Sequence, residues 1–354
     1  MHLTGPESRQ ERENPLKALK KITIGINGFG RIGRTLYRLL EPVPHMDVVL
    51  VNDLADSRTL AHLLRYDSIH GPLPHPVSVT DRGFRMGNTE TALTNFGEPG
   101  QIPWGEYGVD LVVEATGRFK NRKFLEDHLA QGARKVLLSA PPEDADIPMV
   151  VYGINDHLLS PETAIFSCAS CTTHSAAPLI SVLDGLCGIR QAYITTVHSY
   201  TSDQSLHDRP HRDLRRARAA GQSIVPTTTG AAKALTRIFP HLSDVIGGCG
   251  IRVPVPNGSL TDITAHVRNP ASIAEINATF KRISENELQN ILFFTEDPIV
   301  SVDINNSCYS CTFDSQMTSV VGNMVKVIGW YDNETGYSSR VRDSIQLLIE
   351  RNFI

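Results

Sequence analysis

Short apolar runs alternate with stretches of helical periodicity in the first part of the chain. Runs typical of buried strands cover residues 21–27, 48–53, 109–115 and 135–139. Between the last two runs, residues 121–131 place apolar side chains at helical spacing. This alternation predicts an α/β unit on a doubly wound parallel sheet, whose ligand lies at the carboxyl ends of the strands. Residues 65–104, rich in Gly and Pro, predict an antiparallel excursion within this unit.

The pattern changes after about residue 170. We expect a helix after Thr172 and another at residues 271–286. Strand-like runs are found at residues 190–198, 245–253, 259–268, 298–304 and 323–331. Mixed strands with few helices predict a second, α+β unit built on an antiparallel sheet. Residues 338–350 have the apolar spacing of an amphipathic C-terminal helix.

A glycine-rich turn follows the first predicted strand. Gly28, Gly30 and Gly33 have the G-x-G-x-x-G spacing, and Asp53 closes the second strand 20 residues later. Such glycines let the backbone approach a pyrophosphate, which binds the free N–H groups of a helix N-terminus. An acid placed like Asp53 accepts hydrogen bonds from a ribose diol and repels a 2′-phosphate. The motif predicts a dinucleotide site that prefers NAD to NADP.

Composition serves mainly to exclude classes of protein. The chain has 354 residues, 41% of them hydrophobic and 20% charged, with a net charge of −4. These values are typical of a soluble globular protein and offer no electrostatic basis for binding nucleic acid or an anionic membrane. We find no apolar stretch near the roughly 18–20 residues that span a bilayer, and no signal-peptide core. We therefore expect a cytoplasmic protein without nucleic-acid or membrane partners.

The cysteines offer one candidate for chemistry. Cys171 falls between a strand-like and a helical run, and a helix N-terminus stabilises a thiolate. His198 lies at the end of a predicted strand. A buried thiol and a structural histidine would explain each residue alone, whereas the pair beside a dinucleotide site suggests thiol-dependent aldehyde oxidation. The C-x-x-C pairs, Cys168/Cys171 and Cys308/Cys311, are too far apart to predict a metal site.

Nine motifs in one order resemble the phosphorylating glyceraldehyde-3-phosphate dehydrogenase family, and only the first twenty residues lie outside this likeness. The motifs are Asn27–Arg34, Arg65–Gly71, Glu114–Arg118, Ala169–Thr173, Val197–Thr201, Asp213–Arg218, Thr228–Lys233, Arg252–Pro254 and Trp330–Glu334. The resemblance implies NAD-dependent oxidative phosphorylation of D-glyceraldehyde 3-phosphate to 1,3-bisphosphoglycerate through a cysteine thioester. It also implies a homotetramer that works in glycolysis or gluconeogenesis.

Roles for individual residues follow from the resemblance. Cys171 resembles the nucleophile, and His198 the base that lowers the thiol pKa and takes a proton. Asn333 resembles the residue that orients the nicotinamide carboxamide. The other expected NAD contacts are Gly28, Phe29, Gly30, Arg31, Ile32, Gly33, Asp53, Thr116, Gly117 and Ser139. Substrate phosphate is expected at Thr201 and Arg252, and the attacking inorganic phosphate at Ser170, Thr172, Thr229 and Gly230.

The predicted organisation has two domains and two terminal segments. Residues 1–20 form a flexible extension. Residues 21–170 form the NAD-binding domain, which a C-terminal helix of residues 336–354 completes. Residues 171–335 form the catalytic domain. The long basic segment 200–229 is expected to be functional or to lie at an interface between subunits.

Some positions depart from the family's pattern and keep other interpretations open. His174 stands where Asn is usual, Ser175 where Cys is common, Thr335 where Trp is usual, and Arg209 where Leu or Gly is frequent. Alternatives are erythrose-4-phosphate dehydrogenase, aspartate-semialdehyde dehydrogenase, and a binding or regulatory protein that has lost efficient catalysis. The threonines at 228 and 229 favour acyl-phosphate formation over the first two.

Overall fold

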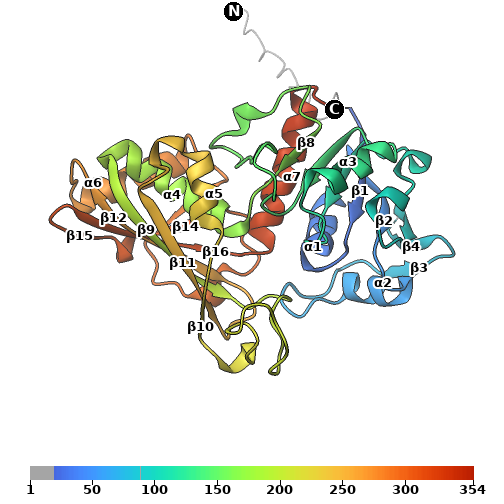
Figure 1. Ribbon diagram of the computed structural model, residues 1–354, viewed down its shortest axis with the longest axis horizontal. Helices are drawn as coiled ribbons and strands as arrows, with labels where there is room; N and C mark the ends of the chain where they lie inside the picture. Colours follow the sequence, from blue (N-terminus) through green and yellow to red (C-terminus); the bar gives the residue numbers. More distant parts are fainter. Residues whose placement is uncertain (1–19, 88) are drawn as a thin grey trace, which may run out of the picture.

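The strands of the first half form one sheet in the computed structural model, which describes residues 20–87 and 89–354 (Figure 1). Its order is β3-β4-β5-β2-β1-β6-β7-β8. The bounds are β1 (Ile22–Asn27), β2 (Met46–Asn52), β3 (Val77–Val79), β4 (Gly83–Met86), β5 (Thr89–Thr94), β6 (Leu111–Glu114), β7 (Lys135–Leu138) and β8 (Ile165–Ser167). Strands β5, β2, β1, β6, β7 and β8 pair in parallel, whereas β3–β4 and β4–β5 are antiparallel. The predicted parallel sheet and its antiparallel excursion are thus confirmed.

Four helices belong to this sheet, and the last of them comes from the far end of the chain. They are α1 (Arg31–Leu40), α2 (Ser57–Arg65), α3 (Arg122–Ala130) and α7 (Thr335–Glu350). Side chains of Asp56 and Asn121 accept N–H bonds at the starts of α2 and α3, as capping residues do. The apolar face of α7 is buried in the core of the first sheet through Val341, Ile345 and Leu348. Figure 1 shows α7 between the two halves of the molecule.

The second sheet has the order β10-β11-β9-β12-β16-β14-β13, with β15 paired to β16. Its strands are β9 (Ile189–Ser199), β10 (Val225–Thr227), β11 (Ile246–Val253), β12 (Ser259–Val267), β13 (Leu292–Thr295), β14 (Cys311–Asp314), β15 (Ser319–Val321) and β16 (Met324–Tyr331). The helices are α4 (Cys171–Cys187), α5 (Ala231–Ile238) and α6 (Ile273–Glu285). The α+β unit is confirmed, but the sheet is mixed, because β11 runs parallel to β9 and β13 parallel to β14.

The predicted strand at residues 298–304 is wrong. Residues Ser301–Ile304 form a 3₁₀ helix, and the Asp303 carboxylate accepts the N–H of Val300 at 2.8 Å. Val300 and Val302 are 56% and 64% exposed, so their alternation with polar residues marks no buried sheet face. A side chain that bonds nearby backbone competes with strand pairing.

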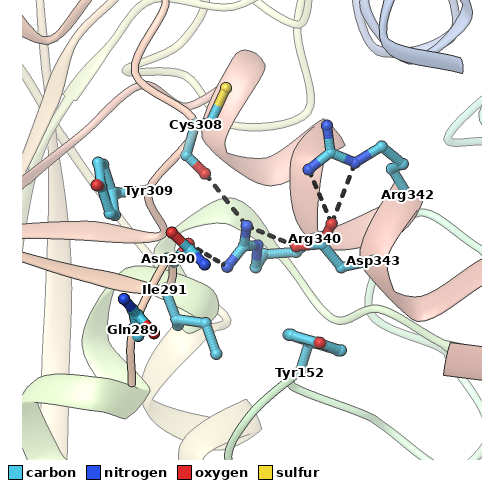
Figure 2. A pocket seen from close by; sticks show the side chains of 9 residues that line it. All are labelled: Tyr152, Gln289, Asn290, Ile291, Cys308, Tyr309, Arg340, Arg342 and Asp343. Atoms are coloured by element: carbon cyan, nitrogen blue, oxygen red, sulfur yellow. Dashed lines mark hydrogen bonds and ion pairs between the residues drawn. The ribbon is translucent and has the colours of Figure 1, made fainter. Parts of the chain in front are cut away.

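Arg340 connects α7 to the second sheet (Figure 2). Its guanidinium group donates to the carbonyl oxygens of Asn290 at 3.0 Å and Cys308 at 3.3 Å, and pairs with Asp343 at 2.6 Å. These carbonyls lie just before β13 and β14, beside a cavity of about 380 Å³ that Tyr152 also lines. Arg340 is only 1% exposed, and its bonds hold α7 against loops of the second sheet.

The boundaries 21–170 and 171–335 stay predictions, and the expected flexible extension lies, apart from Lys20, outside the described residues. All strands of the first sheet fall within residues 22–167, and all strands of the second within residues 189–331. Among the described residues, no helix combines the length and the apolar character that crossing a bilayer requires.

Candidate active site

The glycine turn between β1 and α1 has the backbone geometry that its sequence predicts. Gly28 has a φ of +93°, and a Cβ there would lie 2.7 Å from the backbone nitrogen of Thr116. A Cβ on Gly33 would collide with the carbonyl oxygen of Gly28, whereas Gly30 faces open space. No side chain caps α1. The first N–H groups of α1 are therefore available to an anion such as a pyrophosphate.

Asp53 fixes this turn from the neighbouring strand. Its carboxylate accepts the N–H of Phe29 at 2.7 Å and the N–H of Ala55 at 3.0 Å. The Phe29 ring is buried against Tyr37 and Phe84, so its contribution at the turn comes from the backbone. Asp53 is half-buried, which leaves part of its carboxylate accessible to a ribose.

Arg31 contributes to the turn in a different way. Its guanidinium group forms ion pairs with Asp67 and Glu334. Glu334 also lies 2.8 Å from His70 Nε2, and the other ring nitrogen of His70 is 2.8 Å from Asn306 Oδ1. Burial is the largest single influence and lowers the pKa of His70, but the bond to Glu334, the Asp332 charge and the bond to Asn306 together outweigh it, so the net shift is upward. This network joins the start of α1 to the loop between β16 and α7.

A fully buried carboxylate supports the other side of the cofactor region. Glu114, at the end of β6, accepts hydrogen bonds from Asn27 Nδ2 and from the Thr116 N–H at 2.8 Å. The indole N–H of Trp104 donates to His128 Nδ1 at 2.9 Å, so His128 carries its proton on Nε2 and donates to Glu114 at 3.2 Å. The carboxylate has donors on both oxygens, and through them it positions Thr116.

Cys171 is the first residue of α4, as predicted. The preceding residue, Ser170, caps the helix, because its Oγ accepts the N–H of Thr173 at 3.2 Å. One residue earlier, the buried Ala169 has a φ of +49°, a left-handed conformation that is uncommon for alanine. Such strain often occurs where a chain must present a functional group. Here the turn from β8 into α4 presents the Cys171 thiol.

His198 lies beside this thiol, near the end of β9. Its Nε2 is 3.5 Å from Cys171 Sγ. Its Nδ1 lies 2.7 Å from the carbonyl oxygen of Ser199 and 2.9 Å from an Arg252 nitrogen. The Arg252 nitrogen also donates to the Ser199 carbonyl, at 2.8 Å. A proton on Nδ1 satisfies the shorter contact and avoids opposing two lone pairs, so Nε2 keeps its lone pair for the thiol.

The electrostatic environment favours a neutral pair. Burial, and then the Arg252 charge, lower the pKa of His198 to about 3. Burial raises the pKa of Cys171, against the opposite effect of Arg252. In the ligand-free protein the side chains are therefore an imidazole and a thiol at neutral pH, and the imidazole can accept the thiol proton when the sulfur attacks.

Two cavities meet at these residues. A cavity of about 600 Å³ brings together most predicted cofactor and substrate residues: Gly30, Arg31, Ile32, Thr116, Ser139, Ser170, Cys171, Thr201, Arg252, Asn333 and His198. A smaller cavity of about 180 Å³ adds Thr172, Thr229 and Gly230. Cys171, Ser170, His198 and Arg252 line both. The remaining predicted residues, Gly28, Phe29, Gly33, Asp53 and Gly117, form or support the turns around the larger cavity.

Arg216 also lines the smaller cavity and was not predicted as a site residue. It donates to Thr227 Oγ1 at 3.0 Å and to the Thr228 carbonyl at 3.3 Å, and pairs with Asp203 at 2.6 Å. In the sequence it is one of several arginines in a basic segment. Its place in the motif Asp213–Arg218, in the same segment as the threonines of the smaller cavity, is the signal that could have singled it out.

Two of the residues that depart from the family's pattern, His174 and Thr335, contact groups other than the Cys171–His198 pair. His174 Nε2 donates to the carbonyl oxygen of Cys168 at 3.0 Å, and burial lowers its pKa to about 3. Its ring packs edge-on against Tyr337. Thr335 begins α7, where its N–H bonds Asp332 Oδ1 at 2.8 Å. The Thr335 side chain lies 3.4 Å from His70 Nδ1. Within the described residues, neither the His174 nor the Thr335 side chain forms a hydrogen bond with Cys171 or His198.

Comparison with known proteins agrees with this geometry. Two family models match: the NAD-binding domain of glyceraldehyde 3-phosphate dehydrogenase over residues 22–122, and its C-terminal domain over residues 170–333. The chain is 48% identical over 324 residues to the glyceraldehyde-3-phosphate dehydrogenase of Geobacillus stearothermophilus, covering 91% of this chain and 96% of that protein.

Other relatives agree. The Mycobacterium avium enzyme of the same name is 48% identical over 92% of this chain and 98% of its own length. The Streptomyces coelicolor enzyme is 49% identical over 91% and 97%. With matching domains in the expected order and this identity over nearly the whole length, the chain belongs to the glyceraldehyde 3-phosphate dehydrogenase family.

Proposed function

We propose that this protein catalyses the NAD-dependent oxidative phosphorylation of D-glyceraldehyde 3-phosphate to 1,3-bisphosphoglycerate. The observation that carries the proposal is the Cys171 Sγ–His198 Nε2 pair, 3.5 Å apart where two cavities meet. The larger cavity continues to the glycine turn and has room for a cofactor. The smaller cavity gives a second ligand access to the same sulfur.

The residues around the sulfur can carry both halves of the reaction. Cys171 adds to the aldehyde carbon as His198 takes the thiol proton and passes it to the former carbonyl oxygen, which gives a hemithioacetal and leaves the ring neutral again. NAD, when bound, supplies the hydride acceptor. His198 then takes the hydroxyl proton of the hemithioacetal, and the carbon attached to Cys171 becomes a thioester. Attack by inorganic phosphate on that carbon breaks the carbon–sulfur bond and releases the acyl phosphate and the thiolate.

Two anions must bind near the sulfur in this reaction, and the charges and N–H groups of the cavities suit them. We assign the substrate phosphate to Thr201 and Arg252, whose guanidinium group is the cation that both cavities share. We assign the attacking phosphate to the smaller cavity. There α5 begins at Ala231, directly after Thr229 and Gly230; Gly230 has no side chain that could cap the helix, and Thr229 Oγ1 accepts the Ala231 N–H at 3.2 Å. Arg216 adds positive charge on the same side.

Steady-state formation of NADH by the purified protein tests the function. Turnover of D-glyceraldehyde 3-phosphate should require phosphate, and without phosphate NADH should stop at about one equivalent per active site. Fast, phosphate-independent oxidation of erythrose 4-phosphate would support the alternative dehydrogenase. NAD binding with no turnover on either aldehyde would support a binding or regulatory role.

Cofactor preference should follow from Asp53. Its carboxylate would meet a dianion in NADP, and like charges at a binding site cost several kcal/mol. Arg209 is exposed, and a screened guanidinium typically gains only about 0–1 kcal/mol. We expect NAD to be preferred at least about tenfold in kcat/KM, or about 1.4 kcal/mol.

Asp53→Ala should lower the ratio of kcat/KM with NAD to kcat/KM with NADP. It should also lower kcat/KM with both cofactors, because the carboxylate holds the Phe29 and Ala55 N–H groups. Arg209→Leu, the comparison variant, should widen the ratio slightly. Equal kcat/KM with NAD and NADP in the unmodified protein would contradict this prediction.

We propose a homotetramer as the working form. Segment 200–229, which includes β10, projects at the lower edge of the view in Figure 1, and its Leu206, Leu214 and Ile224 are 73%, 82% and 70% exposed. Large exposed aliphatic side chains gathered on one segment mark an interaction surface. Light scattering should give about 156 kDa, four times the 39.0 kDa of the chain. Leu214→Glu should lower this mass, Val79→Glu on β3 should not, and a stable, active monomer would refute the proposal.

A further inference from the structure

Asn333 is held by two serine hydroxyls. It lies between β16 and α7, is 6% exposed, and lines the larger cavity. Its Oδ1 is 2.9 Å from Ser199 Oγ and 3.0 Å from Ser259 Oγ. The two serines come from the end of β9 and the start of β12, so three segments that are distant in sequence meet at this amide.

The direction of these hydrogen bonds fixes the amide. Ser259 Oγ also accepts the backbone N–H of Ser199 at 3.1 Å. With a lone pair engaged there, the hydroxyl proton of Ser259 points to Asn333 Oδ1, and Ser199 Oγ donates to the same oxygen. Two donors on Oδ1 hold the side chain with Nδ2 turned the other way. The amide N–H groups are thus left for an acceptor in the cavity, such as a carboxamide oxygen.

Ser259 acts on a second group through the same contact. Ser259 Oγ holds the backbone N–H of Ser199, and the carbonyl oxygen of Ser199 lies 2.7 Å from His198 Nδ1. This carbonyl selects the tautomer that leaves a lone pair on Nε2 for Cys171. One buried hydroxyl, on a residue only 1% exposed, therefore supports both the cofactor amide and the base.

We propose that Ser259 is a positioning residue that ties the orientation of the Asn333 amide to that of the His198 ring. Ser199 Oγ shares only the first of these tasks, because its carbonyl is backbone and survives substitution. The inference rests on the proposed function in taking NAD as the ligand of Asn333. It assigns no contact with substrate to either serine.

Calorimetric titration of NAD into the purified protein tests the inference without any turnover. Ser259→Ala and Ser199→Ala should each raise the NAD dissociation constant about fivefold, the net effect of one hydrogen bond. In an Asn333→Ala background neither serine substitution should raise it further, because the amide through which they act is gone. An equal rise in both backgrounds would overturn the proposal, and so would no rise in the unmodified background.

The effect of Ser259 on the His198 ring is measured separately, as the pH profile of Cys171 alkylation by iodoacetamide. Ser259→Ala should slow alkylation near neutral pH about threefold or more, and Ser199→Ala should not. The matched control is Ser175→Ala, which removes a buried hydroxyl bonded at 2.9 Å to Thr261 on the same strand β12. If Ser175→Ala weakened NAD binding as much as Ser259→Ala does, the loss would reflect a general loosening of β12, and the positioning role of Ser259 would be refuted.

Failure of the proposed function would look different. It would be seen as absent NADH formation by the unmodified protein, whatever the titrations show. Failure of the present inference would be seen as an active, NAD-binding protein in which the serine substitutions change neither affinity nor alkylation in the stated pattern.

Discussion

Replacing Cys171 by serine should reduce NADH formation at least about 1,000-fold, equivalent to about 4 kcal/mol in the activation barrier. The hydroxyl would occupy the same place at the start of α4, 3.5 Å or more from His198 Nε2. It is a far weaker nucleophile than the thiol, and a serine ester is not the thioester that phosphate must cleave. The measurement is steady-state NADH formation with saturating substrate and phosphate.

NAD binding should survive this change, because the thiol lies 3.5 Å from His198 and, among the described residues, forms no hydrogen bond with the glycine turn. The matched control is Cys308→Ser, which replaces an exposed thiol and leaves intact the backbone carbonyl that Arg340 uses. Substantial turnover by Cys171→Ser, or an equal loss in Cys308→Ser, would remove Cys171 from its assigned role.

Replacing His198 by asparagine should lower kcat about 100- to 10,000-fold, the usual contribution of a general base. The amide places N–H donors near the sulfur and offers no lone pair of comparable basicity. Because the pKa of His198 is lowered to about 3, the native ring is neutral and able to accept a proton throughout the neutral range. The pKa of Cys171 is raised by burial, so without the base its alkylation should require still higher pH.

Alkylation of Cys171 as a function of pH checks this prediction. His198→Asn should shift the rise in rate to higher pH. His174→Asn is the control, since it removes another buried ring close to Cys171 whose Nε2 bonds the Cys168 carbonyl. A profile for His198→Asn that coincides with that of the unmodified protein would contradict the role of the ring.

The strands β1, β2, β6 and β7 could be predicted because they are largely buried and read as apolar runs, whereas no bounds were predicted for the three-residue β8. The helix α7 was predictable for the related reason that one apolar stripe faces a core. A strand was wrongly predicted at residues 298–304 because Val300 and Val302 alternate with polar residues, although both face solvent. The short strand β10 was missed, since three residues inside a long basic segment carry no periodicity.

The sequence predicted those parts of the site that depend on local backbone conformation, such as the glycine turn and the start of α4. It could not be predicted where groups meet across the fold. Ser199 lies in the motif Val197–Thr201 and Ser259 lies in none of the nine motifs, but the sequence around neither serine indicates a contact with Asn333. These contacts arise only when β9, β12 and β16 pair side by side. Likewise, the hydrogen bond from His128 to the Glu114 carboxylate, and that from Trp104 to His128, join residues that are distant in the sequence.

The position of α7 constrains how the protein is made. The core around residues 22–167 remains open until Val341, Ile345 and Leu348 join it, and these residues are synthesised after every strand of the second sheet. The N-terminal half therefore cannot fold to completion as synthesis proceeds, although domains made first generally fold first. Its apolar groove stays uncovered while the whole second sheet is translated. Emergence of α7, with Arg340 then bonding the loops before β13 and β14, becomes the event that closes both halves together.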